Sequence, residues 1–116
     1  MKFGRSKLDK FNDYQEFAVT TVNNGLSKRD QLANFAMGTA GEAGEVADIV
    51  KKHLYQGHEL DVNALTKEVG DVLWYLANLC TQVDISFADV AQKNMQKLKA
   101  RYPDGFKTAD SEDRND

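Results

Sequence analysis

The chain contains a single proline, Pro103, and this feature constrains its fold more than any other. Proline breaks helix interiors because it lacks the backbone N–H and clashes with the preceding turn. Its absence from the chain before that position therefore permits long helices. Apolar residues recur there at the three- and four-residue intervals of amphipathic helices, and no segment shows the alternation of a strand. The sequence predicts an all-α fold.

Four helices are predicted from this spacing and from the residues that favour helix ends. We expect them at about 8–23 and 28–54, then from the cap residue Asp61 to 83 and from the cap residue Ser86 to 101. Ser27, Asp61 and Ser86 can each accept a hydrogen bond from a first-turn backbone N–H. The turn at 56–58 is short, so the second and third helices must be antiparallel neighbours. A central helical hairpin is therefore expected.

Length and composition limit the possible classes of protein. A chain of 116 residues is expected to form one domain over 1–106, with the acidic, polar stretch 107–116 as a flexible tail. The net charge is −3 and the basic residues are dispersed, which argues against a nucleic-acid partner. No apolar stretch has the length of a membrane span. The single Cys80 is interpreted as a reduced thiol in a cytoplasmic protein.

Two pairs of acidic residues stand out on the predicted hairpin. Glu42 and Glu45 lie on its first helix, and Glu68 and Asp71 lie on its second. Other acidic pairs share the same spacing, so spacing alone does not exclude a solvated charged face. Each helix of the hairpin is expected to contact the other through its apolar stripe, the predicted seam. On a helical wheel, both acidic pairs lie roughly 80° to 150° from this seam, in the same rotational sense. The antiparallel arrangement then brings them to one side, each about 15 Å from the turn, and we expect the four carboxylates to converge.

Such a cluster requires a cation, because half-buried carboxylates repel one another. Its expected neighbours are not lysines but Gly38, Gly41, Ile49, Tyr75 and Leu79. Oxygen ligands without His or Cys favour Mg²⁺, with Mn²⁺ as an alternative. A di-iron carboxylate site would require Glu-x-x-His pairs, and neither acidic pair has this form.

Three segments, 41–52, 67–79 and 94–106, resemble the MazG-like all-α nucleoside triphosphate pyrophosphohydrolases, and the resemblance extends over about 11–106. The family pattern is Glu-Glu-x-x-Glu followed by Glu-x-x-Asp. Gly41 replaces the first acid, and the other four match. The resemblance implies a four-helix bundle-like MazG fold that is oligomeric. It also implies Mg²⁺-dependent hydrolysis of an NTP or dNTP to a monophosphate and pyrophosphate, in nucleotide-pool house-cleaning.

The resemblance also suggests roles for individual residues. The four carboxylates would hold the metal, and either Glu42 or Glu45 would orient or deprotonate the attacking water; the sequence does not choose between them. Phosphate and base contacts are expected from polar and aromatic residues, each of which could instead serve packing or solubility. These substrate-binding candidates are Tyr75, Asn94, Lys97, Arg101, Gln15 and Lys52, with Phe11 as a further candidate for the base.

Trp74 is predicted to lie at a subunit interface. It points away from the predicted seam, and the small residues Gly70, Ala77 and Thr81 surround it, which suggests that another helix packs there. A homodimer or homotetramer is expected. Two alternatives to a house-cleaning enzyme stay open, namely a phosphoribosyl-ATP pyrophosphohydrolase-like enzyme and a non-catalytic metal-binding helical oligomer.

Overall fold

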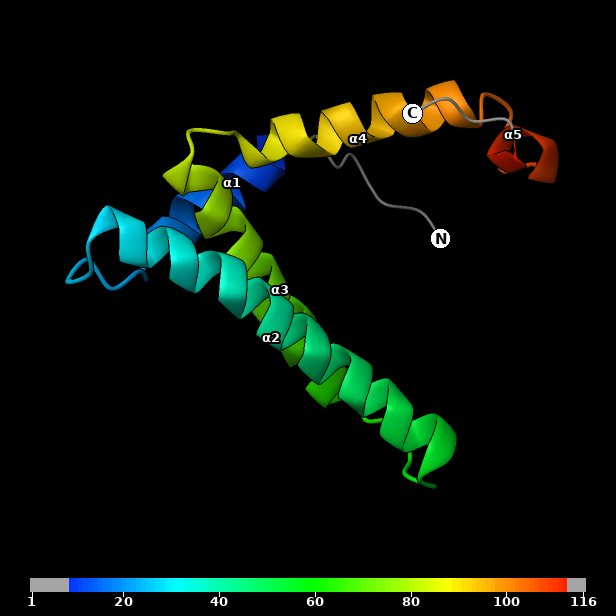
Figure 1. Cartoon of the computed structure of the whole chain (residues 1–116), viewed down its shortest axis with the longest axis horizontal. Coiled ribbons are helices and arrows are strands. Elements are labelled where there is room, and N and C mark those ends of the chain that lie inside the picture. Colours follow the sequence, from blue (N-terminus) through cyan, green and yellow to red (C-terminus); the bar gives the residue numbers. More distant parts are fainter. Residues whose placement is uncertain (1–8, 113–116) are drawn as a thin grey trace.

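The computed structural model describes residues 9–112, which form five α-helices and no β-strand. In chain order these are α1 (Asp9–Val19), α2 (Lys28–Tyr55), α3 (Val62–Gln82), α4 (Phe87–Arg101) and α5 (Thr108–Glu112), as labelled in Figure 1. The prediction of an all-α fold is confirmed. None of the described helices is long and apolar enough to cross a membrane.

Helix starts follow from side-chain caps, as the sequence predicts. The Ser27 and Ser86 hydroxyls accept hydrogen bonds of 3.1 Å from the backbone N–H groups three residues later. Asp61 Oδ1 accepts a similar bond of 3.0 Å from the Ala64 N–H. Each bond satisfies a donor that would otherwise lack a partner in the first turn, a contribution of about 1 kcal/mol.

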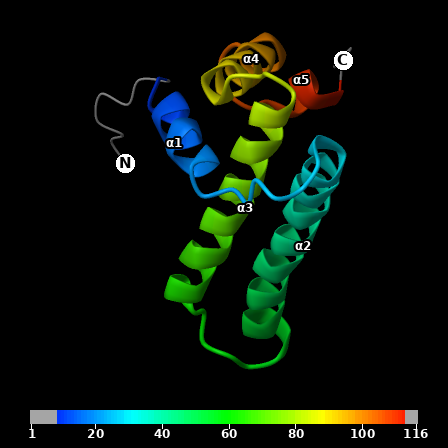
Figure 2. The ribbon, with the colours of Figure 1, turned by 90° about the vertical axis from the view of Figure 1, so that its left-hand side faces the viewer.

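The antiparallel pair formed by α2 and α3 is the centre of the molecule (Figure 2). The chain reverses through residues 56–61, where Gly57 has φ of +73°, a conformation that glycine adopts without strain. Between the helices, Phe35 and Asn78 are almost fully buried, and Gln82 Nε2 donates a hydrogen bond of 2.6 Å to Gln31 Oε1. The predicted hairpin is therefore present.

The face of α2 that contacts α3 differs from the predicted seam. Gln31, Phe35 and Gly38 face α3, since the first two are buried and the third approaches the Tyr75 ring. Phe35 is itself a member of the predicted seam, but the centre of that seam lies about 100° further round the helix, and most of its other members are exposed. Its members Leu32 and Leu54, for example, are 40% and 61% exposed. The most apolar stripe of α2 is thus left uncovered, which corrects the assumption that this stripe packs on the neighbouring helix.

A second small core joins α1 to α3 and α4. Ala18 of α1 and Ala77 of α3 are fully buried against each other's helices, and Phe87 completes the cluster. Because both contact residues are alanines, the two helix backbones can approach closely. Phe11 adds an edge-on contact to Phe87, with 5.8 Å between ring centroids.

Two amide side chains of α1 hold the beginning of α4. Asn12 Oδ1 accepts hydrogen bonds from the Ser86 hydroxyl at 3.0 Å and from the Ala88 N–H at 2.9 Å. Gln15 Oε1 accepts one of 2.8 Å from the Phe87 N–H. The first turn of α4 therefore receives its acceptors from α1, and this junction sets the direction of α4.

Beyond this junction α4 projects away from the hairpin (Figure 1). The described chain has a radius of gyration of 17.2 Å, whereas a compact chain of about this length has about 13 Å. Residues 92–100 of α4 are all exposed. The expected four-helix bundle is therefore not closed within one chain, because α4 packs mainly on α1 and leaves the hairpin after its first turn.

The acidic tail begins with a short helix. Residues 108–112 form the short helix α5, preceded by a turn in which the Tyr102 and Phe106 rings lie 5.3 Å apart. Residues 1–8 and 113–116 lie outside the described residues. The flexibility expected of the tail stays a prediction.

The contact of Gly38 with Tyr75 yields a stability prediction. A Cβ at Gly38 would overlap the Tyr75 ring, so Gly38→Ala is expected to lower the free energy of unfolding by about 1–3 kcal/mol, as overpacking does. Gly44 on the same helix has no atom near its Cβ position. Gly44→Ala is therefore expected to raise that free energy by about 0.5–1 kcal/mol. Urea denaturation measures both, and equal effects of the two changes would contradict the contact.

Candidate metal centre

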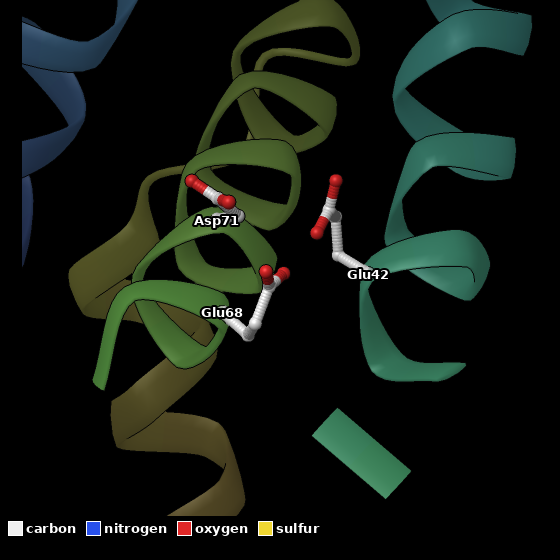
Figure 3. Close-up of side chains that lie close together, drawn as sticks. All are labelled: Glu42, Glu68 and Asp71. Atoms are coloured by element: carbon white, nitrogen blue, oxygen red, sulfur yellow. The ribbon is translucent and has the colours of Figure 1, made fainter. Parts of the chain in front are cut away.

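Three carboxylates from the two helices of the hairpin meet at one point. Each of Glu42, Glu68 and Asp71 offers an oxygen, and these oxygens all lie within 4.8 Å of one another (Figure 3). Glu42 comes from α2, and the other two are one turn apart on α3. Glu42 and Glu68 are half-buried, whereas Asp71 is exposed. Three of the four acids predicted from the sequence therefore converge.

Glu45 lies outside this group. It follows Glu42 by one turn of α2 and is exposed. Its negative charge nevertheless contributes to raising the pKa of Glu42, so it lies within electrostatic range of the cluster. A ligand role for Glu45 stays a prediction.

The three carboxylates cannot all be ionised comfortably without a cation. The pKa of Glu42 is raised from 4.5 to about 7, first by a hydrogen bond with Glu68, then by burial and by the charges of Glu68, Asp71 and Glu45. At neutral pH the cluster therefore retains a proton for part of the time. The Oε2 atom of Glu68 is also buried without a hydrogen-bond partner among the described residues.

The donor set fits a divalent metal ion. The lysines nine and ten residues after Glu42 on α2 pair with Asp48 instead, at 3.7 Å for Lys51 and 2.9 Å for Lys52. These pairs lower the pKa of Asp48 and raise that of Lys52. Carboxylate oxygens alone, with one of them buried and unpaired, are the ligands that hard cations prefer. The cluster is thus consistent with a divalent metal.

Tyr75 and Trp74 lie one turn beyond Asp71 on α3. Their rings meet edge to face, with centroids 5.0 Å apart and an interplanar angle of 90°. Tyr75 is half-buried against Gly38 of α2. This places an aromatic ring beside the carboxylates, where the sequence predicts it, and leaves its role in substrate binding untested.

The neighbours of Trp74 belong to its own chain. Its indole N–H donates a hydrogen bond of 2.7 Å to the Thr21 hydroxyl, just after α1, and its ring meets Phe35 of α2 edge-on at 5.9 Å. Another helix does pack beside Trp74, as its small neighbours suggest, but that helix is α1. Its place at a subunit interface stays a prediction.

The structure gives Gln15 a full set of partners within the chain. Its Nε2 donates to the Thr81 hydroxyl at 3.1 Å and to the Ile85 carbonyl at 2.9 Å, in addition to the bond that its Oε1 accepts. The protein itself thus satisfies the polar side chain of Gln15, and its predicted role in substrate binding stays a prediction.

Three predicted substrate residues lie on α4, which leads away from the hairpin (Figure 1). Asn94 and Lys97 are exposed, and Arg101 at the end of the helix is half-buried. The described chain does not bring them to the carboxylates, because its α4 is held by α1.

Sequence reasoning missed Tyr14 as a neighbour of the centre, and it placed Gly38 there without its contact with Tyr75. Burial and the charge of Asp71 raise the pKa of Tyr14, so α1 brings a phenol close to the cluster. Gly38 provides the space that Tyr75 occupies. A glycine inside a long helix was a signal for the contact between Gly38 and Tyr75. The position of Tyr14 near Asp71 depends instead on where α1 crosses α3, which helical periodicity does not reveal.

Comparisons with known proteins agree with this geometry. Residues 31–106 match the family described as the MazG nucleotide pyrophosphohydrolase domain. The matched region contains all the carboxylates described above. The chain is also similar to the Gene 37 protein of Mycobacterium phage L5, with 40% identity over 78 residues, covering 64% of this chain and 68% of the phage protein. No solved structure matches the chain.

The raised pKa of Glu42 predicts a pH-dependent response to metal. In the metal-free protein this group favours the folded state most below pH 4.5, and that contribution is lost as the pH rises through about 7. Mg²⁺ competes with the proton, so it is expected to raise the melting temperature more at about pH 8 than at about pH 6. At a Mg²⁺ concentration of roughly 100 times its dissociation constant, binding would add about 2.7 kcal/mol to the free energy of unfolding.

Differential scanning fluorimetry with Mg²⁺, Mn²⁺ and EDTA measures this effect. The Glu42→Gln variant removes the titrating group and should lose both the metal response and its pH dependence. A metal response of equal size at both pH values in the wild-type protein would contradict the assignment.

Proposed function

Because the chain belongs to the family of MazG nucleotide pyrophosphohydrolase domains, we propose that it is a Mg²⁺-dependent nucleoside triphosphate pyrophosphohydrolase. The observation that carries this proposal is the meeting of Glu42, Glu68 and Asp71 between the two helices of the hairpin. The substrate is an NTP or dNTP, the products are the monophosphate and pyrophosphate, and the role is nucleotide-pool house-cleaning.

The carboxylates have distinct tasks in this proposal. Glu42, Glu68 and Asp71 hold Mg²⁺, which when bound supplies the positive charge that neutralises the phosphate oxygens. Glu45 lies one turn away, exposed and outside that group, so it is left to accept the proton of the attacking water. The water oxygen bonds to the α-phosphorus, the bond to the bridging oxygen breaks, and pyrophosphate leaves.

Substrate contacts are proposed from two regions. Tyr75, half-buried one turn beyond Asp71, borders the nucleotide, and Lys52 lies on the helix that carries Glu42. Asn94, Lys97 and Arg101 would contact the phosphates. Since α4 leads away from the hairpin of its own chain (Figure 1), this last proposal requires the α4 of another subunit.

An exposed apolar face on the hairpin supports a homo-oligomer. On each of α2 and α3, the apolar stripe lies about 100° round the helix from the face that contacts the other helix. The displacement has the same rotational sense on both helices, so the antiparallel pairing places the two stripes on one face of the hairpin. Six of their members are 37–61% exposed, which is unusual for so many large apolar side chains on one surface. These are Leu32, Val50, Leu54, Val62, Val69 and Val83.

The proposed reaction is tested by pyrophosphate release from a panel of NTPs, dNTPs and phosphoribosyl-ATP with Mg²⁺. Glu45→Gln is expected to lower kcat by about 10²–10⁴-fold, as loss of a general base does, while retaining the stabilisation by metal. Glu68→Gln should lose both the turnover and the stabilisation by metal. Glu59→Gln, at an exposed position in the hairpin turn, serves as the matched control and should lose neither.

Each outcome separates the candidates. Turnover of phosphoribosyl-ATP alone would transfer the assignment to that substrate. Metal-dependent assembly without turnover of any nucleotide would indicate a non-catalytic helical oligomer instead.

The proposed oligomer is tested by light scattering after size-exclusion chromatography. Val50→Glu places a charge in the exposed apolar face and is expected to reduce the species to the 13.0 kDa monomer. Met37→Glu is the matched control, since Met37 is 69% exposed and lies about 140° round α2 from Val50. Dissociation by the Met37 change alone would place the interface on the other side of the helix.

A further inference from the structure

The loop of residues 20–27 joins α1 to α2 and crosses over α3 (Figure 2). The side chain of Gln31 in the first turn of α2 fastens this loop. Its Nε2 donates hydrogen bonds to the carbonyls of Asn23 and Leu26 at 3.2 Å and 3.4 Å, and its Oε1 accepts the bond from Gln82. Because Gln31 is only 9% exposed, its amide depends on these partners within the chain.

Within this loop Asn24 is followed by Gly25, and no other asparagine of the chain precedes a glycine. Both residues are exposed, and the Asn24 side chain has no hydrogen bond to a described residue. The side-chain carbonyl carbon of an asparagine can close a five-membered ring with the backbone nitrogen of the next residue. A Cβ on that next residue crowds the approach, and glycine has none. Ring closure is therefore expected more readily here than at any other asparagine of the chain.

We propose that Asn24 is a site of spontaneous covalent modification by deamidation. The Gly25 nitrogen bonds to the side-chain carbonyl carbon of Asn24 and loses its proton, and the side-chain amino group leaves with a proton as ammonia. Water from the solvent then opens the ring at either of its two carbonyls. The product is an aspartate, or an isoaspartate in which the backbone runs through the side-chain carbon. One water is consumed and one ammonia released, and nothing is oxidised or reduced.

The preceding residue, Asn23, lowers the rate of this reaction without taking part in it. Its Oδ1 accepts a hydrogen bond of 2.9 Å from the Gly25 N–H, as asparagine side chains do in turns. The nitrogen that must attack Asn24 is thereby held by the residue on the other side of Asn24. Since this bond has to break before the ring closes, its free energy adds to the barrier of ring closure.

The isoaspartate product disturbs the loop where Gln31 holds it. It adds one carbon atom to the backbone between residues 24 and 25, and therefore between the two carbonyls that Gln31 contacts. With the spacing of these carbonyls changed, the amide of Gln31 cannot keep both bonds. A buried donor without an acceptor destabilises the folded state. The aspartate product leaves the backbone unaltered and adds only an exposed charge, which is expected to have little effect.

The reaction is measured by mass spectrometry of the protein after storage in mildly alkaline buffer. The peptide that carries Asn24 is expected to gain the mass difference between oxygen and NH, with ammonia released at the same rate. Asn24→Gln keeps an amide but places it one carbon too far for a five-membered ring, so this variant should lack the change. Asn63, exposed in the first turn of α3 and followed by Ala64, is the internal control and should stay unmodified.

Two substitutions of Asn23 test its effect on the rate. Asn23→Ala removes the acceptor and is expected to raise the rate constant by roughly 2- to 13-fold, as a hydrogen bond of about 0.5–1.5 kcal/mol implies. Asn23→Asp keeps an acceptor oxygen and should react no faster than the wild-type chain. Equal rates for Asn23→Ala and the wild-type chain would refute the role assigned to Asn23.

Thermal unfolding tests the effect on the loop. The isoaspartate form, separated by ion-exchange chromatography, is expected to melt roughly 5 °C below the unmodified chain, as the loss of one buried hydrogen bond implies for a domain of this size. Asn24→Asp carries the charge without the additional backbone atom and should melt with the unmodified chain. In Gln31→Ala, which has no amide to lose, the isoaspartate and unmodified forms should melt together.

The outcomes are independent of the proposed function, because none of these measurements uses a nucleotide or a metal. Modification of Asn63 as fast as Asn24, or a stored chain without mass gain at Asn24, would overturn the proposal. Equal melting temperatures of the isoaspartate and unmodified forms would overturn the effect on the loop. A lack of pyrophosphate release would refute the enzymatic proposal and leave the modification site standing.

Discussion

The antiparallel packing of α2 on α3 is the constraint on which the rest of the molecule depends. The short connection at 56–61 forces it, and the absence of a Cβ at Gly38 lets the Tyr75 ring fit between the helices. The same packing places Glu42 opposite Glu68, at a distance where one of the two carboxyl groups prefers to keep a proton. The hairpin therefore bears an electrostatic cost at its centre, as functional sites commonly do, and a bound cation would remove that cost.

The first helix connects the two halves of the molecule. Its amides hold the beginning of α4, its Ala18 packs on α3, and its Tyr14 extends toward Asp71. The short helix α1 thus fixes the direction of α4 and also borders the carboxylates. A substitution in α1 could therefore affect the centre without touching any acidic residue.

Local chemistry made much of this architecture predictable. Helix ends follow from Ser27, Asp61 and Ser86, because a cap depends only on residues three positions apart. The meeting of acids from α2 and α3 follows from their equal distances to the turn. The rotation of α2 does not follow, because most of its apolar stripe is exposed in the described chain, and Gln31 and Gly38 face α3 together with Phe35, which lies at the edge of that stripe.

Periodicity could not reveal how helices distant in sequence dock. The direction of α4 depends on Asn12 and Gln15, more than 70 residues earlier in the chain, and the neighbours of Trp74 depend on where α1 crosses α3. A helical wheel places each residue on a face but does not say which helix covers that face. For this reason Asn94 and Lys97 were expected near the acids and lie elsewhere in the described chain.

The bonds between α1 and α4 also have a consequence for how the protein reaches its native state. They join residues separated by 72 to 76 positions, whereas the hairpin joins segments connected by a short turn. Loop-closure entropy makes such distant contacts slow to form. The hairpin is thus expected to assemble first, with α1 and α4 docking late. Until they dock, the alanine contact between α1 and α3 stays open to solvent, and during synthesis on the ribosome it cannot be sealed until α4 has emerged.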